Sequence, residues 1–340
     1  MPRLLVTHSG SHGRPLGLVR EAFDDFEVRN CEVPAGDLNV EATDRLRMAL
    51  EGCEACLLRP GRLTRDVFEA ADDLRVVALT GSGVDHIDLG AATDHGVVVA
   101  NSPGGPAPSV VEHTFAMAFA LLRNLPERSR LVRAGEWERA RSAVTELRGK
   151  TLDVVGLGTI GLAVADTAAD RFDVDIVGYD PYVSEERDHP VFPRYGRERI
   201  EAAGVELVAR RELFERASIV SVHTPLTDET AGLVGAAELA ALGEGYLVNT
   251  GRGGVIDEVA LRDALVEGRL AGAALDVFAE EPPDPGDTLL TAPNLVASPH
   301  VAGVSDQTQE RGLQLAAKSV RAVLGGERPD TVVNPGVYMD

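Results

Sequence analysis

The sequence is poor in cysteine, lysine and aromatic residues, and it has no long hydrophobic run. Three cysteines among 340 residues are too few for a disulfide scaffold. Only Lys150 and Lys318 of the 33 basic residues are lysines, and 54 acidic residues bring the formal net charge to −21. A net negative field repels phosphate backbones, so no nucleic-acid partner is expected. The most apolar helical stretch, residues 115–122, is shorter than the roughly 18 to 20 residues that cross a membrane, so no membrane association is expected.

The first ten residues show no export signal, because their only apolar stretch, residues 4–6, is far shorter than that of a signal peptide. A cytoplasmic location is therefore expected. An acidic surface is typical of a cytoplasm with high salt, where carboxylates keep the surface hydrated and salt screens their repulsion. An acidic, GC-biased proteome explains the composition equally well, so charge alone leaves the halophilic interpretation open.

Apolar runs alternate with amphipathic stretches twice along the chain, which predicts two doubly wound α/β domains with parallel sheets. The length agrees with about two domains of roughly 150 residues each. The strands predicted for the first domain are residues 4–7, 55–59, 75–79 and 97–100, with a helix over 42–50. Those predicted for the second are residues 151–155, 174–179, 219–223, 246–250 and 273–276.

A segment rich in proline and glycine, residues 102–108, separates the two alternations and is predicted to be a hinge outside any helix. Ser109 is predicted to cap the following helix, with Glu112 completing a capping box. The apolar face of that helix, from Val110 to Leu122, is expected to be core or a homodimer seam. A last helix is predicted over residues 305–324.

The strongest local motif is a G-x-G-x-x-G that closes the strand at 151–155 and opens a helix at Ile160. Gly156 allows a tight turn, Gly158 lets the backbone approach a pyrophosphate, and Gly161 permits close packing of the helix on the strand. The next strand ends at Asp180, nineteen residues after Gly161. A carboxylate there accepts hydrogen bonds from ribose hydroxyls and repels a 2′-phosphate, which favours NAD over NADP. Three arginines downstream leave NADP open, namely Arg187, Arg194 and Arg197.

Six motifs in one order, spread over nearly the whole chain, resemble the D-isomer-specific 2-hydroxyacid dehydrogenases. This NAD-linked family includes phosphoglycerate dehydrogenase, glyoxylate and hydroxypyruvate reductases, and D-lactate dehydrogenase. The motifs are residues 81–85, the loop at 156–161, and residues 223–227, 249–257, 275–282 and 298–303. The resemblance implies a Rossmann NAD-binding domain over 102–299 and a discontinuous, flavodoxin-like substrate domain over 1–101 and 300–340.

The resemblance makes Arg252, Glu281 and His300 the catalytic set, and the reduction of a 2-oxo acid needs these residue types. A guanidinium can bind the substrate carboxylate and polarise the neighbouring carbonyl. A histidine suits delivery of a proton to the developing alkoxide, and Glu281 would orient His300 and stabilise its protonated form. Each of the three has a plainer interpretation as a surface or structural residue. Glu280 is the weaker competitor for the acidic role, because the family motif aligns the residue directly before proline.

Further roles follow from the same resemblance. Backbone N–H groups of Ser82, Gly83 and Val84 would hold the substrate carboxylate. Asp276 would lie near the nicotinamide carboxamide, and His223 is interpreted as structural. The residues expected at the cofactor are Gly156, Gly158, Thr159, Ile160, Gly161, Asp180, Thr224, Pro225, Thr250, Gly251, Asp276 and Gly303.

No metal is expected. Cys53 and Cys56 form a C-x-x-C pair, but zinc needs four ligands and Cys31 is the one further cysteine of the sequence. We therefore interpret the pair as structural.

The sequence departs from the family pattern at three places. Pro106 stands where many members carry an asparagine, which removes one possible substrate contact. Residues 184–206 are about ten residues longer than usual and are interpreted as a surface loop or a lid near the adenosine. The sequence ends at Asp340, so the C-terminal regulatory domain of many phosphoglycerate dehydrogenases is not expected.

Together these features predict an NAD-dependent oxidoreductase that interconverts a small 2-oxo acid and a D-2-hydroxy acid, with a homodimer expected from the resemblance. Two alternatives stay open. One is a 3-phosphoglycerate dehydrogenase within the family, in which Arg59 and Arg62 could meet a phosphate. The other is an NAD(H)-sensing corepressor-like protein, because such proteins retain the same three catalytic residue types. Formate dehydrogenase is disfavoured, because that relative has glutamine where Glu281 stands.

Overall fold

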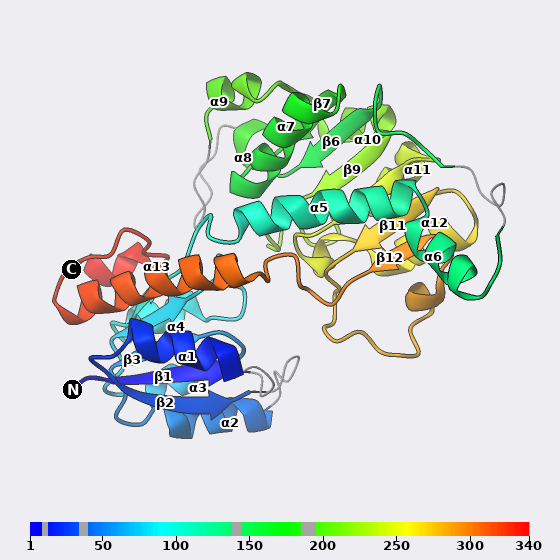
Figure 1. The fold of residues 1–340 in the computed structure, drawn as a ribbon. Coiled ribbons are helices and arrows are strands. Elements are labelled where there is room, and N and C mark those ends of the chain that lie inside the picture. Colours follow the sequence, from blue (N-terminus) through cyan, green and yellow to red (C-terminus); the bar gives the residue numbers. More distant parts are fainter. Residues whose placement is uncertain (9–12, 34–39, 138–143, 185–194, 340) are drawn as a thin grey trace. The chain divides into compact units, whose positions relative to one another are not determined.

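The computed structural model describes residues 1–8, 13–33, 40–137, 144–184 and 195–339 (Figure 1). The chain forms two compact units. Unit 1 comprises Met1–Pro106 and Gly303–Asp340, and unit 2 comprises Ala107–Ala302. Among the described helices, none combines the length and the apolar character that a membrane crossing requires.

Unit 1 is built on a parallel sheet with the strand order β2-β1-β3-β4-β5, which is the flavodoxin-like order. The strands are β1 (Arg3–His8), β2 (Glu27–Glu32), β3 (Ala55–Leu58), β4 (Val76–Leu79) and β5 (Val98–Ala100). Every residue of β3 and β4 is buried, as expected for parallel strands covered on both faces. Its helices are α1 (Gly13–Ala22), α2 (Val40–Ala49), α3 (Arg65–Glu69), α4 (Leu89–Asp94) and α13 (Asp306–Leu324).

Helix α13 brings the C-terminal part of the chain back onto the sheet of unit 1. Leu313 and Val320 join Leu4 and Val76 in one hydrophobic core. Gly312 allows the close approach, because a Cβ there would lie 2.2 Å from the Thr80 carbonyl oxygen. The N-terminal and C-terminal segments therefore form one folded unit.

Unit 2 contains a seven-stranded parallel sheet in the order β12-β11-β10-β9-β6-β7-β8, which is the Rossmann order extended by one strand. The strands are β6 (Thr151–Val155), β7 (Asp175–Tyr179), β8 (Val205–Leu207), β9 (Ile219–Val222), β10 (Tyr246–Asn249), β11 (Gly272–Leu275) and β12 (Leu295–Ala297). The chain reverses its direction across the sheet at β6 and β9. In this fold ligands bind at the carboxyl ends of the strands on either side of such a reversal.

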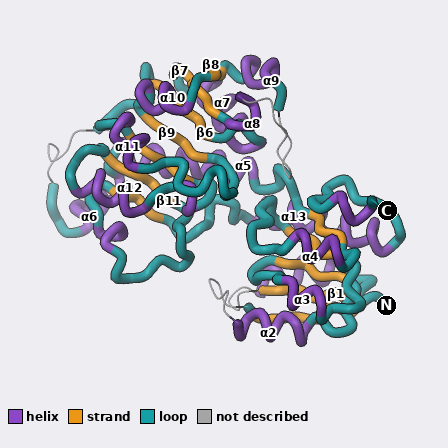
Figure 2. Tube along the Cα trace, turned by 180° about the vertical axis from the view of Figure 1, so that it is seen from behind, coloured by secondary structure: helices purple, strands orange, loops and turns teal. Residues whose placement is uncertain are grey.

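Helices cover both faces of this sheet (Figures 1 and 2). Helices α5 (Ala107–Leu122) and α7 (Thr159–Arg171) pack into one core, with Phe115 and Leu162 among its buried residues. On the other face Leu213, Leu239 and Leu261 fill a second core. They come from α10 (Arg210–Arg216), α11 (Ala236–Leu242) and α12 (Glu258–Val266). The remaining α-helices of unit 2 are α6 (Leu125–Arg133), α8 (Pro181–Ser184) and α9 (Arg197–Ala202).

The two predicted alternations of strands and helices are confirmed, but three strands have no counterpart among the predictions. These are β2, β8 and β12, which lie at sheet edges or carry polar residues. An edge strand is held by backbone hydrogen bonds on one side only and can present polar side chains to water. β2 and β8 lack the apolar run by which the other strands are recognised, and β12 is apolar but only three residues long.

The predicted start of α5 is wrong. The helix begins at Ala107, so Ser109 lies inside its first turn and the capping box with Glu112 does not form. Ala107 and Pro108, assigned to the hinge, are helical. Proline is tolerated there because N–H groups of the first turn have no intrahelical acceptor. The apolar face of α5 is buried in the core of unit 2. The last helix, predicted over residues 305–324, is confirmed as α13, and the Ser305 side chain caps it by accepting a hydrogen bond from the Thr308 N–H.

Candidate active site

The glycine loop follows β6 at the carboxyl edge of the unit 2 sheet. Gly156 has φ +92, and a Cβ there would lie 2.8 Å from the backbone of His223 and Thr224. A Cβ on Gly161 would lie 1.9 Å from the Gly156 carbonyl oxygen. Both positions therefore exclude side chains because of close contacts within the chain itself. A Cβ on Gly158 would meet no atom within 4 Å, so at Gly158, the residue before α7, the backbone is open to an approaching group.

Asp180 lies directly after β7 and binds the glycine loop. Its Oδ2 accepts a hydrogen bond from the Leu157 N–H at 2.9 Å, and its Oδ1 accepts one from the Tyr182 N–H at 2.9 Å. Each carboxylate oxygen can accept further hydrogen bonds, so the predicted contact with ribose is compatible with this arrangement.

Tyr195, a described residue of the segment 184–206, contacts the start of α7. The hydroxyl of Tyr195 lies 3.1 Å from Thr159 Oγ1. Arg187 and Arg194 lie outside the described residues, and Arg197 begins α9.

Several predicted cofactor residues follow β9 and β10 at the same edge. Thr224 Oγ1 is buried and has no hydrogen-bond partner among the described residues. Thr250 Oγ1 lies 3.0 Å from Thr114 Oγ1 on α5. His223 Nε2 contacts Ser221 Oγ at 2.8 Å, and burial lowers the pKa of His223 to about 4, so this imidazole is neutral at physiological pH. Pro225 follows, with its carbonyl oxygen accepting a hydrogen bond from the Thr230 hydroxyl.

His300 and Glu281 form the shortest contact between titratable groups at this edge of the sheet. His300 Nδ1 lies 2.6 Å from Glu281 Oε2, and Glu281 Oε1 accepts a hydrogen bond from the Phe278 N–H at 3.1 Å. Burial favours the neutral acid, but the hydrogen bond from His300 and the charges of His300 and Arg252 outweigh it and lower the pKa of Glu281. Glu281 is therefore a carboxylate at neutral pH. The alternative acid, Glu280, is exposed.

Arg252 is placed by the turn that follows β10. Asn249 is fully buried, and its side-chain amide accepts a hydrogen bond from the Gly251 N–H and donates one to the Arg252 carbonyl. Gly253 packs against the segment before Glu281, since a Cβ there would lie 1.9 Å from the Phe278 carbonyl carbon. This close packing brings the Arg252 turn to the Glu281 loop.

Asp276, directly after β11, holds the loop that carries His300. Asp276 is fully buried, and its carboxylate accepts hydrogen bonds from the Val301 N–H at 2.9 Å and the Ala302 N–H at 2.8 Å. Its carbonyl oxygen accepts one from the His300 N–H at 2.7 Å. His300 has φ +52, a left-handed conformation that few residues other than glycine adopt. The loop is thus held in an uncommon conformation by one buried carboxylate.

Ser298 and His113 belong to this network, but neither was predicted from the sequence to be a functional residue. Ser298 Oγ lies 2.6 Å from Asp276 Oδ1, and His113 Nε2 of α5 lies 3.0 Å from Ser298 Oγ. Ser298 stands in a recognised motif, but His113 is 185 positions away and has no local signal.

The residues predicted to hold the substrate carboxylate belong to unit 1. Ser82, Gly83 and Val84 follow β4, and the hydrogen bonds that fix this loop among the described residues use its carbonyl oxygens. Gly303 also belongs to unit 1.

Of the two arginines considered for a phosphate, Arg59 is half-buried and Arg62 is exposed. Burial lowers the pKa of the Arg59 guanidinium, and Arg59 Nη2 lies 3.5 Å from the neutral Gln309 side chain. The three cysteines are buried free thiols, and burial raises the pKa of each. That environment is typical of structural cysteines rather than reactive ones.

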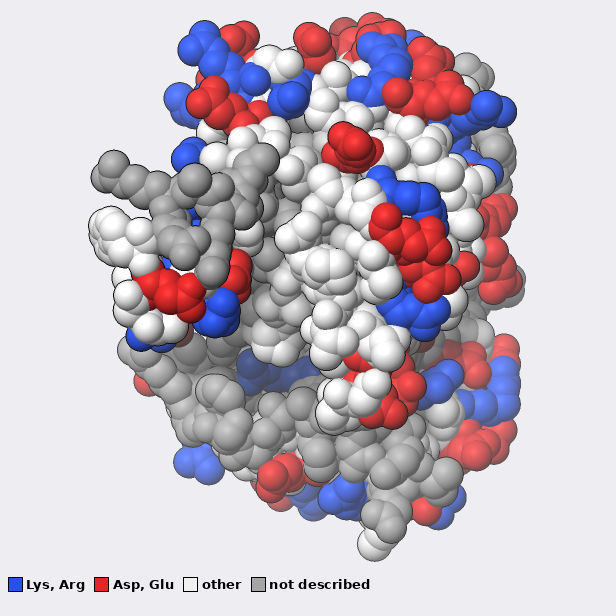
Figure 3. Space-filling view, turned by 90° about the vertical axis from the view of Figure 1, so that its right-hand side faces the viewer, with Lys and Arg blue, Asp and Glu red and all other residues white. Residues whose placement is uncertain are grey.

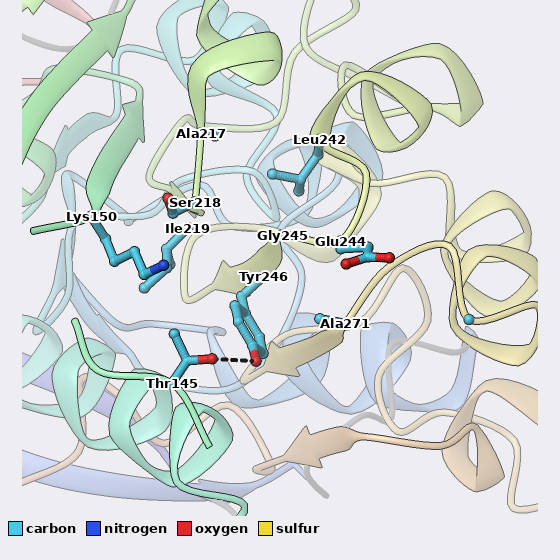
Figure 4. A pocket seen from close by; sticks show the side chains of 11 residues that line it. Thr145, Lys150, Ala217, Ser218, Ile219, Leu242, Glu244, Gly245, Tyr246 and Ala271 are labelled. Carbon is cyan, nitrogen blue, oxygen red and sulfur yellow. Dashed lines mark hydrogen bonds between the residues drawn. The ribbon is translucent and has the colours of Figure 1, made fainter. Parts of the chain in front are cut away.

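A separate hollow lies at the opposite, amino edge of the unit 2 sheet (Figure 4). It has a volume of about 510 Å³ and is lined by Lys150, Ser218, Ile219, Glu244 and Tyr246 among others. The Tyr246 hydroxyl and Thr145 Oγ1 are 3.1 Å apart there. None of the predicted site residues lines it.

The Rossmann strand order and the glycine loop define unit 2 as a dinucleotide-binding domain. Residues 115–302 match the model of the D-isomer specific 2-hydroxyacid dehydrogenase family, NAD binding domain. The chain therefore belongs to this family, as the six motifs predicted, and NAD is the cofactor of the matched domain.

Curated relatives include the D-3-phosphoglycerate dehydrogenases of Bacillus subtilis (strain 168) and Methanocaldococcus jannaschii. The first is 41% identical over 326 residues, covering 95% of this chain and 57% of the relative. The second is 39% identical over 311 residues, covering 91% and 56%. The chain thus spans little more than half the length of these relatives.

Solved structures support the fold over the whole chain. A protein from Thermus thermophilus is 31% identical with a TM-score of 0.81, and the match covers 97% of this chain and 99% of that one. The NADPH-dependent glyoxylate/hydroxypyruvate reductase of Sinorhizobium meliloti, solved with NADP and malonate, is 30% identical with a TM-score of 0.78, covering 98% and 96%.

Proposed function

We propose that the protein is an NAD-dependent oxidoreductase that interconverts a small 2-oxo acid and a D-2-hydroxy acid. The observation that carries this proposal is the 2.6 Å contact between His300 Nδ1 and Glu281 Oε2, at the same sheet edge as the glycine loop. An imidazole held by a carboxylate, beside a dinucleotide site, is an arrangement suited to moving a proton while hydride is transferred.

The residues of unit 2 fit a bound dinucleotide on two grounds. Gly158 is open where a pyrophosphate would approach the start of α7, and the buried Thr224 hydroxyl has no partner among the described residues. Asp180 would accept hydrogen bonds from the adenosine ribose. The other residues of unit 2 proposed at the cofactor are Gly156, Thr159, Ile160, Gly161, Pro225, Thr250, Gly251 and Asp276. Gly303, which belongs to unit 1, is proposed there as well.

Each catalytic residue has a distinct part in the proposed reaction. Bound NADH supplies the hydride that reduces C2 of the 2-oxo acid. Arg252 binds the substrate carboxylate and polarises the carbonyl, whose π electrons move to oxygen as the C–H bond forms. His300, held through Nδ1 by Glu281, delivers a proton from Nε2 to that oxygen. Glu281 remains a carboxylate and stabilises the imidazolium before transfer.

We propose that unit 1 binds the substrate and unit 2 binds the cofactor. Backbone N–H groups of Ser82, Gly83 and Val84 would hold the substrate carboxylate, because the bonds that fix this loop use its carbonyl oxygens. NADH is the expected reductant, since Asp180 repels a 2′-phosphate. We place the reaction in the cytoplasm, where NAD(H) is available.

A 3-phosphoglycerate substrate is the second candidate. It is favoured by the D-3-phosphoglycerate dehydrogenase relatives and by Arg59, a half-buried guanidinium whose side-chain contact in unit 1 is the neutral Gln309. A cation in that position fits an anionic group of the substrate. Arg62 is the second arginine of this proposal.

We further propose a homodimer. Large apolar side chains are exposed on and after α6, with Trp137 exposed by 76% and Leu125 by 58%. Packing against a second copy of the chain would remove these side chains from water. Light scattering at two protein concentrations tests this proposal, and a monomer at both would contradict it.

High salt is a further condition to test. On the face drawn in Figure 3, acidic and basic side chains are interspersed. The net charge of −21 nevertheless predicts repulsion that salt screens, so activity is expected to be maintained at molar salt.

The decisive experiment measures oxidation of NADH and NADPH at low and molar salt. The acids to test are glyoxylate, hydroxypyruvate, pyruvate, 2-oxoisocaproate and 3-phosphohydroxypyruvate. Turnover of one acid supports the enzyme and identifies its substrate. If both cofactors bind and no acid is reduced, the enzyme proposal fails, and a search for protein partners follows from the corepressor-like alternative.

A further inference from the structure

His113 lies on α5 and contacts Ser298 and Asp276, two residues that support the loop carrying His300. Its Nε2 is 3.0 Å from Ser298 Oγ and 3.5 Å from Asp276 Oδ1. The His113 side chain is 25% exposed, whereas that of Asp276 is fully buried. Both carboxylate oxygens of Asp276 already accept hydrogen bonds from backbone N–H groups of the loop.

The positions of these atoms fix the direction of each hydrogen bond. Asp276 Oδ1 and Oδ2 act as acceptors toward Val301 and Ala302, and Ser298 Oγ lies 2.6 Å from Oδ1. That distance is typical of a hydroxyl that donates to a carboxylate. A hydroxyl has one proton, so Ser298 Oγ is the acceptor toward His113. His113 Nε2 must therefore carry a hydrogen.

We propose that His113 is a positioning residue for His300. The effect of His113 on catalysis rests on the proposed function. The Nε2–H group of His113 holds the Ser298 hydroxyl so that its proton points to Asp276. Asp276 in turn fixes the two peptide groups that follow His300 and keeps His300 at φ +52. A second acceptor near the hydroxyl, the Met117 sulfur at 3.5 Å, offers a weaker alternative if His113 is lost.

Three substitutions separate the donor role from simple packing. In His113→Gln the amide nitrogen reaches about as far as Nε2 and can still donate to Ser298. In His113→Asn the amide is too short, and His113→Glu puts a carboxylate where the donor stands. Glu112→Gln is the matched control, because Glu112 is the exposed neighbour of His113 on α5.

We expect the substitutions at His113 to lower kcat to different degrees. They are expected to change the affinity for NADH less than they change kcat. We expect His113→Gln and Glu112→Gln to stay within about threefold of the unsubstituted protein. His113→Asn is expected to lower kcat about tenfold, which corresponds to the loss of one hydrogen bond of the network. His113→Glu is expected to lower kcat further. Equal kcat values for the Gln, Asn and Glu variants would overturn the proposal.

A second readout does not depend on activity. Long-range nitrogen–proton NMR of protein labelled in its eight histidines reports which ring nitrogen carries the hydrogen, and the signal absent from His113→Gln identifies His113. The expected result is hydrogen on Nε2, and a ring protonated on Nδ1 alone overturns the proposal. If no acid is reduced by the unsubstituted protein, the proposed function fails while this measurement still decides the direction of the hydrogen bond.

Discussion

Asp153 provides a test of the structure that needs no substrate. It lies in the middle of β6, is fully buried, and neither carboxylate oxygen has a hydrogen-bond partner among the described residues. Side chains alternate along a strand, so Asp153 shares the face of Val155, which packs into the core beneath α10, α11 and α12. Burial raises the pKa of Asp153 to about 8, although the charge of Arg216 opposes the shift.

This shift makes the stability of the protein depend on pH in a known direction. The unfolded chain ionises Asp153 near pH 3.9, whereas the folded protein keeps it protonated up to about pH 8. Between these values the folded state holds one more proton, so the free energy of unfolding falls by about 1.4 kcal/mol per pH unit through this residue. From pH 4 to pH 7 the loss amounts to about 4 kcal/mol.

Asp153→Asn removes the titration and retains the size of the side chain. The variant is expected to gain stability over the unsubstituted protein as pH rises, with the difference growing by about 4 kcal/mol between pH 4 and pH 7. Urea unfolding followed by circular dichroism at several pH values measures it. Asp175→Asn, an exposed residue of β7, is the control. A difference that stays constant within about 1 kcal/mol across this range would refute the reasoning, because it would mean that Asp153 titrates alike in both states.

Three further predictions concern the proposed reaction. His300→Ala is expected to lower kcat by about 100-fold or more while NADH binding, followed by fluorescence, stays nearly unchanged; equal losses in both would contradict its acid–base role. Glu281→Gln is expected to cost about tenfold in kcat, a modest loss because the His300 and Glu281 side chains are 48% and 36% exposed and water screens the pair. Since the pKa of Glu281 is lowered, its contribution is present at neutral pH and is lost as pH falls through that pKa, so a rate that stays constant into the acid range would count against it. Asp180→Ala is expected to raise the ratio of NADPH to NADH use by about tenfold, and an unchanged ratio in steady-state assays would remove Asp180 from the recognition of ribose.

Local patterns were enough to predict the features that depend on neighbouring residues. Gly156 and Gly161 are required by a turn and a close approach within a few residues, and the buried strands show themselves as apolar runs. The last helix, predicted over residues 305–324, follows from a local pattern in the same way. The start of α5 was predicted wrongly because proline at its second position is compatible with a helix, which the composition of residues 102–108 conceals.

The amino-acid sequence therefore determined the two-domain α/β class, the dinucleotide loop and, through six ordered motifs, the family. Tertiary packing decided the structural features that those motifs do not encode. The edge strands β2 and β12 exist because a neighbouring strand supplies their hydrogen bonds. The contact of His113 with Ser298 arises where elements distant along the chain meet, and so does the burial of Asp153 without a hydrogen-bond partner among the described residues. No local pattern encodes such contacts, because their free energy depends on which groups share the same buried space.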